Sequence, residues 1–266
     1  MSTPTISASQ VKELRDQTGA GMMECKRALI EADGDLEEAR RLLRERGMAA
    51  AGKRAGRETT EGKVLAKVDG RVGAIVAVGC ETEPVAKNER FLVFARSVLD
   101  LVYEQGPEAV EQLEEERVQL IGLIGENILV VGAARMEAGE GEVLAPYVHP
   151  PAEKIGVLVR ARATPELARL VAMQIASSKP RYLKREDVPE STIVEERGIY
   201  EKLPEVTAKP EDIRPQIVEG MLAKRFLAES VLVDQPWIHD PDRTVGEALA
   251  EHGGEVLEFV RYSVSE

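Results

Sequence analysis

The chain has 266 residues, 43% of them hydrophobic and 31% charged, so it is long enough for two domains and apolar enough to bury a core. Its formal net charge of −12 at pH 7 argues against direct binding of nucleic acid, which requires a basic surface to neutralise phosphates. A local basic patch lies at Lys53, Arg54 and Arg57, and nucleic-acid binding stays an alternative for this small region.

Three short helices are predicted at the N-terminus. Ser7 and Gln10 have the spacing of a capping box, which begins the first helix, and a Gly-Ala-Gly turn at residues 19–21 precedes the second. The third helix is expected to end at Gly47. The apolar residues of these helices share one face, so we expect a bundle resembling the ubiquitin-associated (UBA) type over residues 1–54. A bundle of this size is marginally stable alone and should dock on another surface.

A first core subdomain is predicted at residues 55–140. Residues 49–62 mix glycine, alanine and charged residues without an apolar period, which is typical of a linker. Two strands follow, at residues 64–68 and 72–78, on either side of an Asp-Gly hairpin turn. An apolar helix is expected from about Asn88 to Tyr103.

A weak internal repeat predicts a second, related subdomain at residues 141–188 and 230–266. The segment Ile155–Val159 resembles Val72–Val76, and a threonine and a proline precede an apolar helix after each of them. Both subdomains should therefore combine an antiparallel sheet with a helix, which gives an α+β fold.

Residues 189–229 differ from both subdomains. They predict two helices that each carry one narrow apolar stripe, which indicates an αα-hairpin that projects from the core. Such a hairpin is similar to coiled-coil elements that mediate dimerisation, so a homodimer through this hairpin stays open. The chain then returns through two strand-like segments at residues 231–233 and 256–262.

Two adjacent methionines, Met22 and Met23, lie at the start of the second predicted helix. Methionine is flexible and polarizable, which suits a surface that grips a partner. The same spacing is equally typical of side chains that fill a small core. The residues alone do not decide between these two interpretations.

A second local feature is the segment Cys80–Asn88, CETEPVAKN, where a strand ends and a helix begins. Loops at such places often carry function. A proline-containing turn followed by an asparagine helix cap explains the same residues, and the sequence alone favours this purely structural interpretation.

The sequence contains no catalytic or cofactor-binding pattern. It lacks a Ser/His/Asp arrangement, a phosphate-binding GxxxxGKS or GxxxxGKT loop and a dinucleotide fingerprint. Its two cysteines, Cys25 and Cys80, have no metal-ligand spacing, and its three histidines are scattered. We therefore expect no enzyme, no cofactor and no metal site. Neither a signal segment nor a membrane span is recognisable, which favours a cytoplasmic protein that does not bind membranes.

The segment Leu14–Leu29, LRDQTGAGMMECKRAL, resembles the N-terminal signature of the elongation factor Ts family, the guanine-nucleotide exchange factors of elongation factor Tu. Further segments that fit this family follow in order along nearly the whole chain: Gly125–Ile128, Tyr147–His149, Lys154–Val159, Val171–Tyr182 and Gln235–Trp237. The chain stops soon after Tyr262, so we expect it to lack the C-terminal helical module of longer family members.

The resemblance implies that Thr82–Val85 is the loop that the family inserts beside the magnesium site of the GTPase. The family element reads Thr-Asp-Phe-Val, so Thr82 and Val85 match, while Glu83 replaces the aspartate and Pro84 replaces the phenylalanine. Proline offers less apolar area and a fixed φ. Either a smaller wedge suffices, Val85 takes over, or exchange relies more on other contacts.

The resemblance also implies partner-binding roles for Arg15, Met22 and Met23, and weaker ones for Gln174 and Trp237, which could equally be packing residues. The implied function is to bind elongation factor Tu with GDP and to promote GDP release by disturbing its magnesium and phosphate site. Two alternatives stay open. A non-catalytic adaptor would bind peptides or ubiquitin-like folds through the N-terminal bundle, whereas an α+β metabolic enzyme would need converging polar groups.

Overall fold

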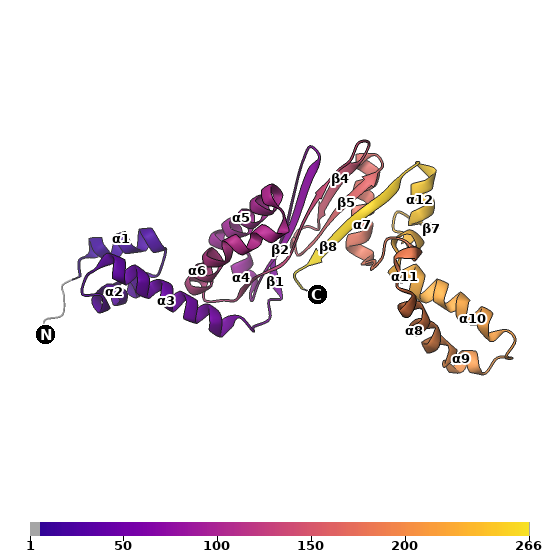
Figure 1. Ribbon diagram of the computed structural model, residues 1–266, viewed down its shortest axis with the longest axis horizontal. Coiled ribbons are helices and arrows are strands. Elements are labelled where there is room, and N and C mark those ends of the chain that lie inside the picture. The colour runs from indigo at the N-terminus through magenta and orange to yellow at the C-terminus, as the bar shows by residue number, and fades with distance from the viewer. Residues whose placement is uncertain (1–5, 266) are drawn as a thin grey trace. The chain divides into compact units, whose positions relative to one another are not determined.

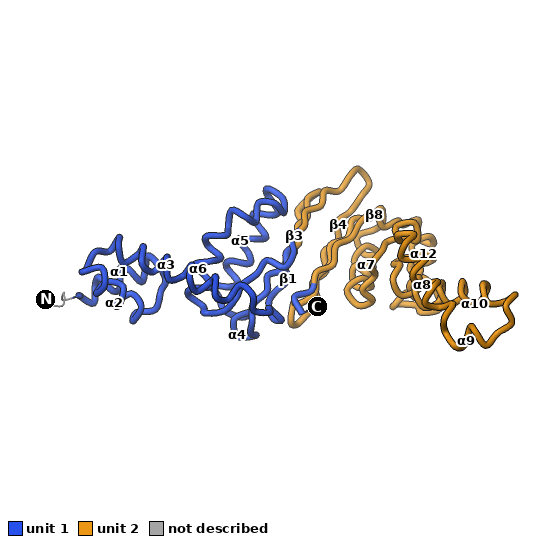
Figure 2. Tube along the Cα trace, turned by 60° about the horizontal axis from the view of Figure 1, so that its bottom comes forward, with its two compact units in different colours: residues 1–65, 76–133, 263–266 blue, residues 66–75, 134–262 orange. Residues whose placement is uncertain are grey.

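The computed structural model describes residues 6–265. It combines helices with small sheets, so the expected α+β class is confirmed (Figure 1). The chain divides into two compact units (Figure 2). Unit 1 consists of the residues up to 65, residues 76–133 and the residues from 263 onward, and unit 2 consists of residues 66–75 and 134–262.

The three predicted N-terminal helices are present in unit 1. They are α1 (Ala8–Thr18), α2 (Met22–Glu31) and α3 (Leu36–Arg54). The predicted capping box is confirmed, because Ser7 Oγ accepts from the Gln10 N–H at 3.2 Å and Gln10 Oε1 accepts from the Ser7 N–H at 3.0 Å. Leu14, Cys25 and Leu29 are fully buried and form the centre of this bundle.

The prediction that the third helix ends at Gly47 is wrong, because α3 continues to Arg54. Alanines at 49–51 favour helix, and tertiary packing stabilises the extension. A Cβ atom added to Gly122 would lie 2.8 Å from the Cα of Gly47, so α3 crosses α6 (Glu114–Ile124) at very short range. The predicted linker therefore begins as the last turns of α3.

One sheet contains β1 (Glu61–Asp69), β2 (Val72–Cys80) and β3 (Ile128–Glu137), in that order, and the division between the units falls within these strands. β2 is buried along nearly its whole length, as its apolar sequence predicted. The short α4 (Glu83–Ala86) precedes α5 (Glu89–Gln105), and the 3₁₀ helix η1 (Pro107–Leu113) leads to α6. Asn88 caps α5 by accepting from the Arg90 N–H at 2.9 Å, so the predicted helix start is confirmed.

In unit 2, β4 (Val143–Val148), β5 (Ile155–Arg162) and β8 (Glu255–Ser263) form a second sheet in that order. β4 and β5 are antiparallel, with Val143 opposite Ala161 and Val148 opposite Gly156. α7 (Pro165–Ser178) packs on this sheet, and the two together bury a core that includes Val157, Val171 and Ile175. The predicted strand at residues 256–262 is confirmed as β8.

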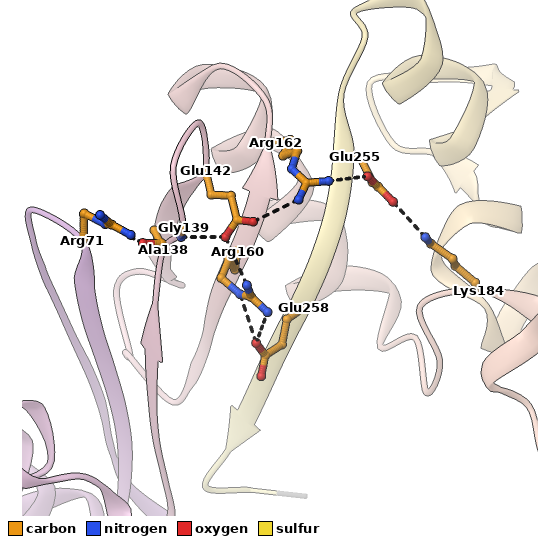
Figure 3. Close-up of polar contacts among 9 residues, drawn as sticks. All are labelled: Arg71, Ala138, Gly139, Glu142, Arg160, Arg162, Lys184, Glu255 and Glu258. Atoms are coloured by element: carbon orange, nitrogen blue, oxygen red, sulfur yellow. Dashed lines mark hydrogen bonds and ion pairs between the residues drawn. The ribbon is translucent and has the colours of Figure 1, made fainter.

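Glu142 stands at the centre of an ion-pair chain on this sheet (Figure 3). Its side chain is 7% exposed and lies 3.1 Å from Arg160 and 3.4 Å from Arg162. Glu142 also accepts from the Gly139 N–H at 2.8 Å, and this bond, together with the Arg160 guanidinium, holds the pKa of the carboxyl below its ordinary value. Three further ion pairs extend this series: Arg160–Glu258 at 3.0 Å, Arg162–Glu255 at 3.4 Å and Lys184–Glu255 at 3.0 Å.

The hairpin segment has a hydrophobic core of its own within unit 2. After the 3₁₀ turn η2 (Arg185–Asp187) it comprises α8 (Glu190–Glu201), α9 (Pro204–Thr207), α10 (Arg214–Met221), the π-helix η3 (Leu222–Leu227) and α11 (Ala228–Ser230). Val206, Val218 and Leu222 are among its buried residues. Val194 and Ile199 of α8 stay 58% and 48% exposed.

The strand predicted at residues 231–233 is wrong. Apart from one bridge between Val231 and Tyr182, this segment forms the 3₁₀ turn η4 (Leu232–Asp234), because the Gln235 N–H bonds back to the Leu232 carbonyl at 3.2 Å. The short strands β6 (Pro236–Trp237) and β7 (Asp240–Thr244) and the helix α12 (Val245–Glu251) follow. No helix within residues 6–265 is both long and apolar enough to cross a membrane.

Candidate functional site

The loop after β2 presents three of its four predicted contact residues to solvent. Thr82, Glu83 and Pro84 are exposed, whereas Val85 is half-buried and the following Ala86 is buried. Glu83 pairs with Lys87 at 2.6 Å one turn later, and this bond raises the pKa of the Lys87 amine. The loop therefore begins a short turn of helix whose exposed end carries a hydroxyl, a carboxylate and a proline ring.

Glu126 holds the base of this loop. Its Oε2 accepts from the N–H groups of Glu81 and Thr82 at 3.1 and 3.0 Å, and its Oε1 accepts from the Thr82 hydroxyl at 2.6 Å. In the opposite direction, Glu81 Oε1 accepts from the Asn127 N–H at 2.7 Å. Glu126 and Asn127 belong to the segment Gly125–Ile128, which fits the family but carries no predicted role. The signal for such a role is an acidic side chain directly after the left-handed Gly125 that ends α6.

The two methionines of the bundle lie on its surface. Met22 and Met23 are 61% and 66% exposed at the first turn of α2, and the bundle core is filled by other residues. The interpretation that they fill a small core is therefore excluded. Arg15 is also exposed, in the last turn of α1. These three side chains are available to a partner.

Arg90 connects the bundle to the helix that follows the loop. Its Nη1 donates to the Gly19 carbonyl at 2.9 Å, and its own N–H is held by the Asn88 cap of α5. Gly19 has a φ of +69° and a Cβ atom there would lie 2.6 Å from Arg90 Nη1, so only glycine fits without strain. Sequence reasoning missed Arg90, because the contact joins residues that are 71 positions apart.

Gln174 lies in the interior of unit 2. Its Nε2 lies 3.1 Å from Ser178 Oγ and 3.2 Å from both Gln235 Oε1 and the Pro236 carbonyl, and its Oε1 accepts from the Ile238 N–H at 2.8 Å. It has no exposed surface. This amide therefore fixes the segment around β6 and presents nothing to solvent.

Trp237 is likewise buried, at 6% exposure, within the core between α7, α12 and the second sheet. Its ring meets that of His239 edge to face, with centroids 4.8 Å apart. The neighbours Ile238 and His239 are exposed. The side chains that a partner can reach here are therefore those of Pro236, Ile238 and His239, and no sequence signal pointed to Ile238 or His239.

No group of three or more His, Cys, Asp or Glu within the described part of the chain is arranged to hold a metal ion. Cys25 and Cys80 are buried thiols, and burial raises the pKa of Cys25. What the described residues offer is a braced, exposed loop and an exposed methionine pair, both in unit 1.

Comparison with known proteins defines the class. A family model described as Elongation factor TS matches residues 81–266. Proteins named elongation factor Ts from Cronobacter sakazakii, Escherichia coli and Shigella boydii are each 43% identical over 266 residues, which covers 98% of this chain and 92% of each relative. The protein is thus a translation elongation factor that serves protein biosynthesis. It belongs to the elongation factor Ts family, as the segment Leu14–Leu29 and the later motifs indicated.

Proposed function

We propose that this protein binds elongation factor Tu carrying GDP and promotes release of the GDP, which recycles the GTPase for translation elongation. The observation that supports this most directly is the exposed segment Thr82–Pro84, held at its base by Glu126 and ready for insertion. The protein would act in the cytoplasm as a regulator of the GTPase and would perform no acid–base chemistry itself.

The exchange reaction is a matter of differential binding. In a GTPase, magnesium bridges phosphate oxygens and protein ligands, and the backbone of the phosphate loop surrounds the phosphates. An exchange factor must bind the nucleotide-free GTPase more tightly than the GDP-bound form. Linkage makes the effect reciprocal, so each tenfold weakening of GDP by the factor is a tenfold weakening of the factor by GDP, about 1.4 kcal/mol.

The loop Thr82–Val85 would disturb the magnesium side of that site. Pro84 is exposed and its ring fixes φ, so it can act as a small, rigid wedge that loses little entropy on insertion. Val85 is half-buried and anchors the turn on its protein-facing side. Glu83 adds a carboxylate near the place where the GTPase holds its cation.

A second contact would be made by Arg15, Met22 and Met23. The methionines are exposed and flexible, which suits an apolar surface on the GTPase. Gln174 and Trp237 are buried, so we propose that they contribute by supporting the exposed Ile238 and His239.

We propose a finer description of the fold on the same basis. The three N-terminal helices would form a UBA-like domain at residues 1–54, and two related sheet-and-helix subdomains would occupy residues 55–140 and 141–188 with 230–266. Residues 189–229 would be a projecting helical hairpin. Its exposed Val194 and Ile199 are suited to a homodimer contact.

The test is release of a fluorescent GDP analogue from elongation factor Tu in the presence of the full chain. We expect faster release, and we expect a variant with alanine at each position from Thr82 to Val85 to lose most of the acceleration. An unchanged release rate with the wild-type chain would contradict the proposed function. It would favour the adaptor alternative, in which the bundle binds a partner without affecting its nucleotide.

A further inference from the structure

We propose that Glu126 is a positioning residue for nucleotide exchange, because its carboxylate fixes the direction in which the inserting loop leaves β2. This inference rests on the proposed function and adds to it a residue that acts through Thr82. Glu126 lies 44 positions from Thr82 in the chain and reaches it from the turn between α6 and β3.

Both oxygens of the Glu126 carboxylate are used at the base of the loop. Oε2 receives two backbone N–H groups in succession, those of Glu81 and Thr82, and Oε1 receives the Thr82 hydroxyl. Hydrogen bonds to an ionised carboxylate are about twice as strong as bonds between neutral groups. Three such donors from two consecutive residues define the orientation of the peptide between them.

The hydroxyl of Thr82 is committed to this contact. Thr82 occupies the N-cap position of α4, where a threonine side chain ordinarily accepts a hydrogen bond from the first turn of the helix. Here the side chain makes no such cap bond and donates to Glu126 at 2.6 Å instead. The threonine therefore anchors the loop to the neighbouring turn and leaves the short helix uncapped.

A second carboxylate braces the same two segments in the opposite direction. Glu81 accepts from the Asn127 N–H, and Asn127 Nδ2 donates to the Arg57 carbonyl at 2.8 Å. Asn127 is only 3% exposed, so water cannot readily replace these bonds. Glu126 thus accepts from two backbone N–H groups of the Glu81–Thr82 segment, and Glu81 accepts from one backbone N–H group of the Glu126–Asn127 segment.

This brace matters because it acts on the exposed end of the loop, beside the backbone bonds of α4 and the contact of the buried Cys80 thiol with the Thr82 carbonyl at 3.3 Å. Thr82, Glu83 and Pro84 are exposed, and the apolar anchoring begins only at Val85 and Ala86. A loop that is ordered in advance loses less entropy on binding. An ordered loop also moves less when it contacts the GTPase, so that the binding free energy is used to distort the nucleotide site of the GTPase. Without Glu126 the loop would change its own conformation on contact and would leave the nucleotide site of the GTPase undisturbed.

The experiment measures GDP release from elongation factor Tu over a range of concentrations of the full chain. It separates the maximal release rate from the concentration that gives half of it. For Glu126→Ala we expect the maximal rate to fall about tenfold, the effect of losing charge-assisted bonds that form the base of the loop. Glu126→Gln, which keeps one acceptor oxygen for the two backbone N–H groups, should recover most of the rate.

A double-mutant cycle with Thr82→Val tests whether Glu126 acts through Thr82. Adding Thr82→Val to Glu126→Ala should cost less than it costs in the wild-type chain, because the shared bond is already lost. If Glu126→Ala does not fold, Thr82→Ser and Thr82→Val test the same contact. Thr82→Ser keeps the hydroxyl that donates to Glu126 and should keep the rate, whereas Thr82→Val removes it and should lower the rate. Fully additive effects would overturn the proposed coupling.

The matched control is Glu142→Gln in unit 2, since Glu142 also accepts a backbone N–H and pairs with arginine but does not contact the loop. It should leave the maximal rate unchanged. If the wild-type chain accelerates release and Glu126→Ala keeps the maximal rate, changing only thermal stability or half-saturation, Glu126 is merely structural and this inference fails alone. If the wild-type chain does not accelerate release, the proposed function fails first.

Discussion

Two regions that the family resemblance assigned to the same task differ in the structure. Met22, Met23 and the loop at Thr82 are exposed in unit 1, whereas Gln174 and Trp237 are buried in unit 2. The first set is accessible to a partner, whereas the second set could act on a partner only through its exposed neighbours. The family resemblance thus suggests which positions contribute to partner binding, and burial distinguishes direct contact from structural support.

The largest test of this difference is Trp237→Ala. Removing a buried tryptophan leaves a cavity and should lower the free energy of unfolding by about 3–5 kcal/mol. Ile238→Ala, one residue later and 42% exposed, should change it by less than about 0.5 kcal/mol. Urea denaturation of both variants measures the contrast, and equal losses would mean that the two side chains share one environment.

A second test concerns the crossing of α3 and α6 in unit 1. Gly122→Ala places a methyl group 2.8 Å from the Cα of Gly47 and should cost about 1–3 kcal/mol. Gly52→Ala is the control, because a Cβ there meets no atom within 4 Å and the exchange should stabilise the helix by about 0.5–1 kcal/mol. Thermal unfolding of both variants should show shifts of opposite sign.

A third test addresses the exposed methionines. Replacing Met22 and Met23 together with alanine should leave the free energy of unfolding within about 0.5 kcal/mol of the wild type. The same change should weaken binding to elongation factor Tu about tenfold, the equivalent of 1.4 kcal/mol. Titration calorimetry and urea denaturation give the two numbers. A large loss of stability would place these side chains with the buried set after all.

The smallest effect is expected from pH. The pKa of Glu142 is lowered by the Gly139 N–H and by Arg160, so its contribution to stability is present above the ordinary carboxyl pKa and is lost as the pH falls through the lowered value. The melting temperature of the wild type should therefore drop more steeply in acid than that of Glu142→Gln. Parallel curves would show that this ion pair adds nothing.

Local sequence signals predicted much of the fold. The capping box at Ser7, the buried strand β2 and the helix start at Asn88 all follow from neighbouring residues and are confirmed. The errors occurred where distant contacts decide. α3 continues past Gly47 because α6 packs against it. Residues 232–234 form a 3₁₀ turn although Val231, Leu232 and Val233 favour a strand.

The position of the candidate loop remains a prediction, and the contacts that support it could not be predicted from the sequence. The resemblance implies Thr82–Val85 as the inserting loop, but the sequence could not show that Glu126 and Glu81 each brace the segment of the other. Such contacts join residues 44 to 46 positions apart and have no periodic pattern. Nor did composition reveal that Gln174 is interior, since a glutamine with four partners looks the same in a sequence as an exposed one.

A hydrogen bond between Arg90 and Gly19 joins the turn before Met22 to the helix that follows the loop, so it links the two surfaces of unit 1 that we propose contact the partner. A partner would therefore meet them as a bivalent ligand with a very short linker. Once the first surface has bound the partner, the second is held close to its own contact and has a high effective concentration. The resulting avidity comes from the short distance between the two surfaces. Separating the bundle from the loop would forfeit that gain even if every contact residue were kept.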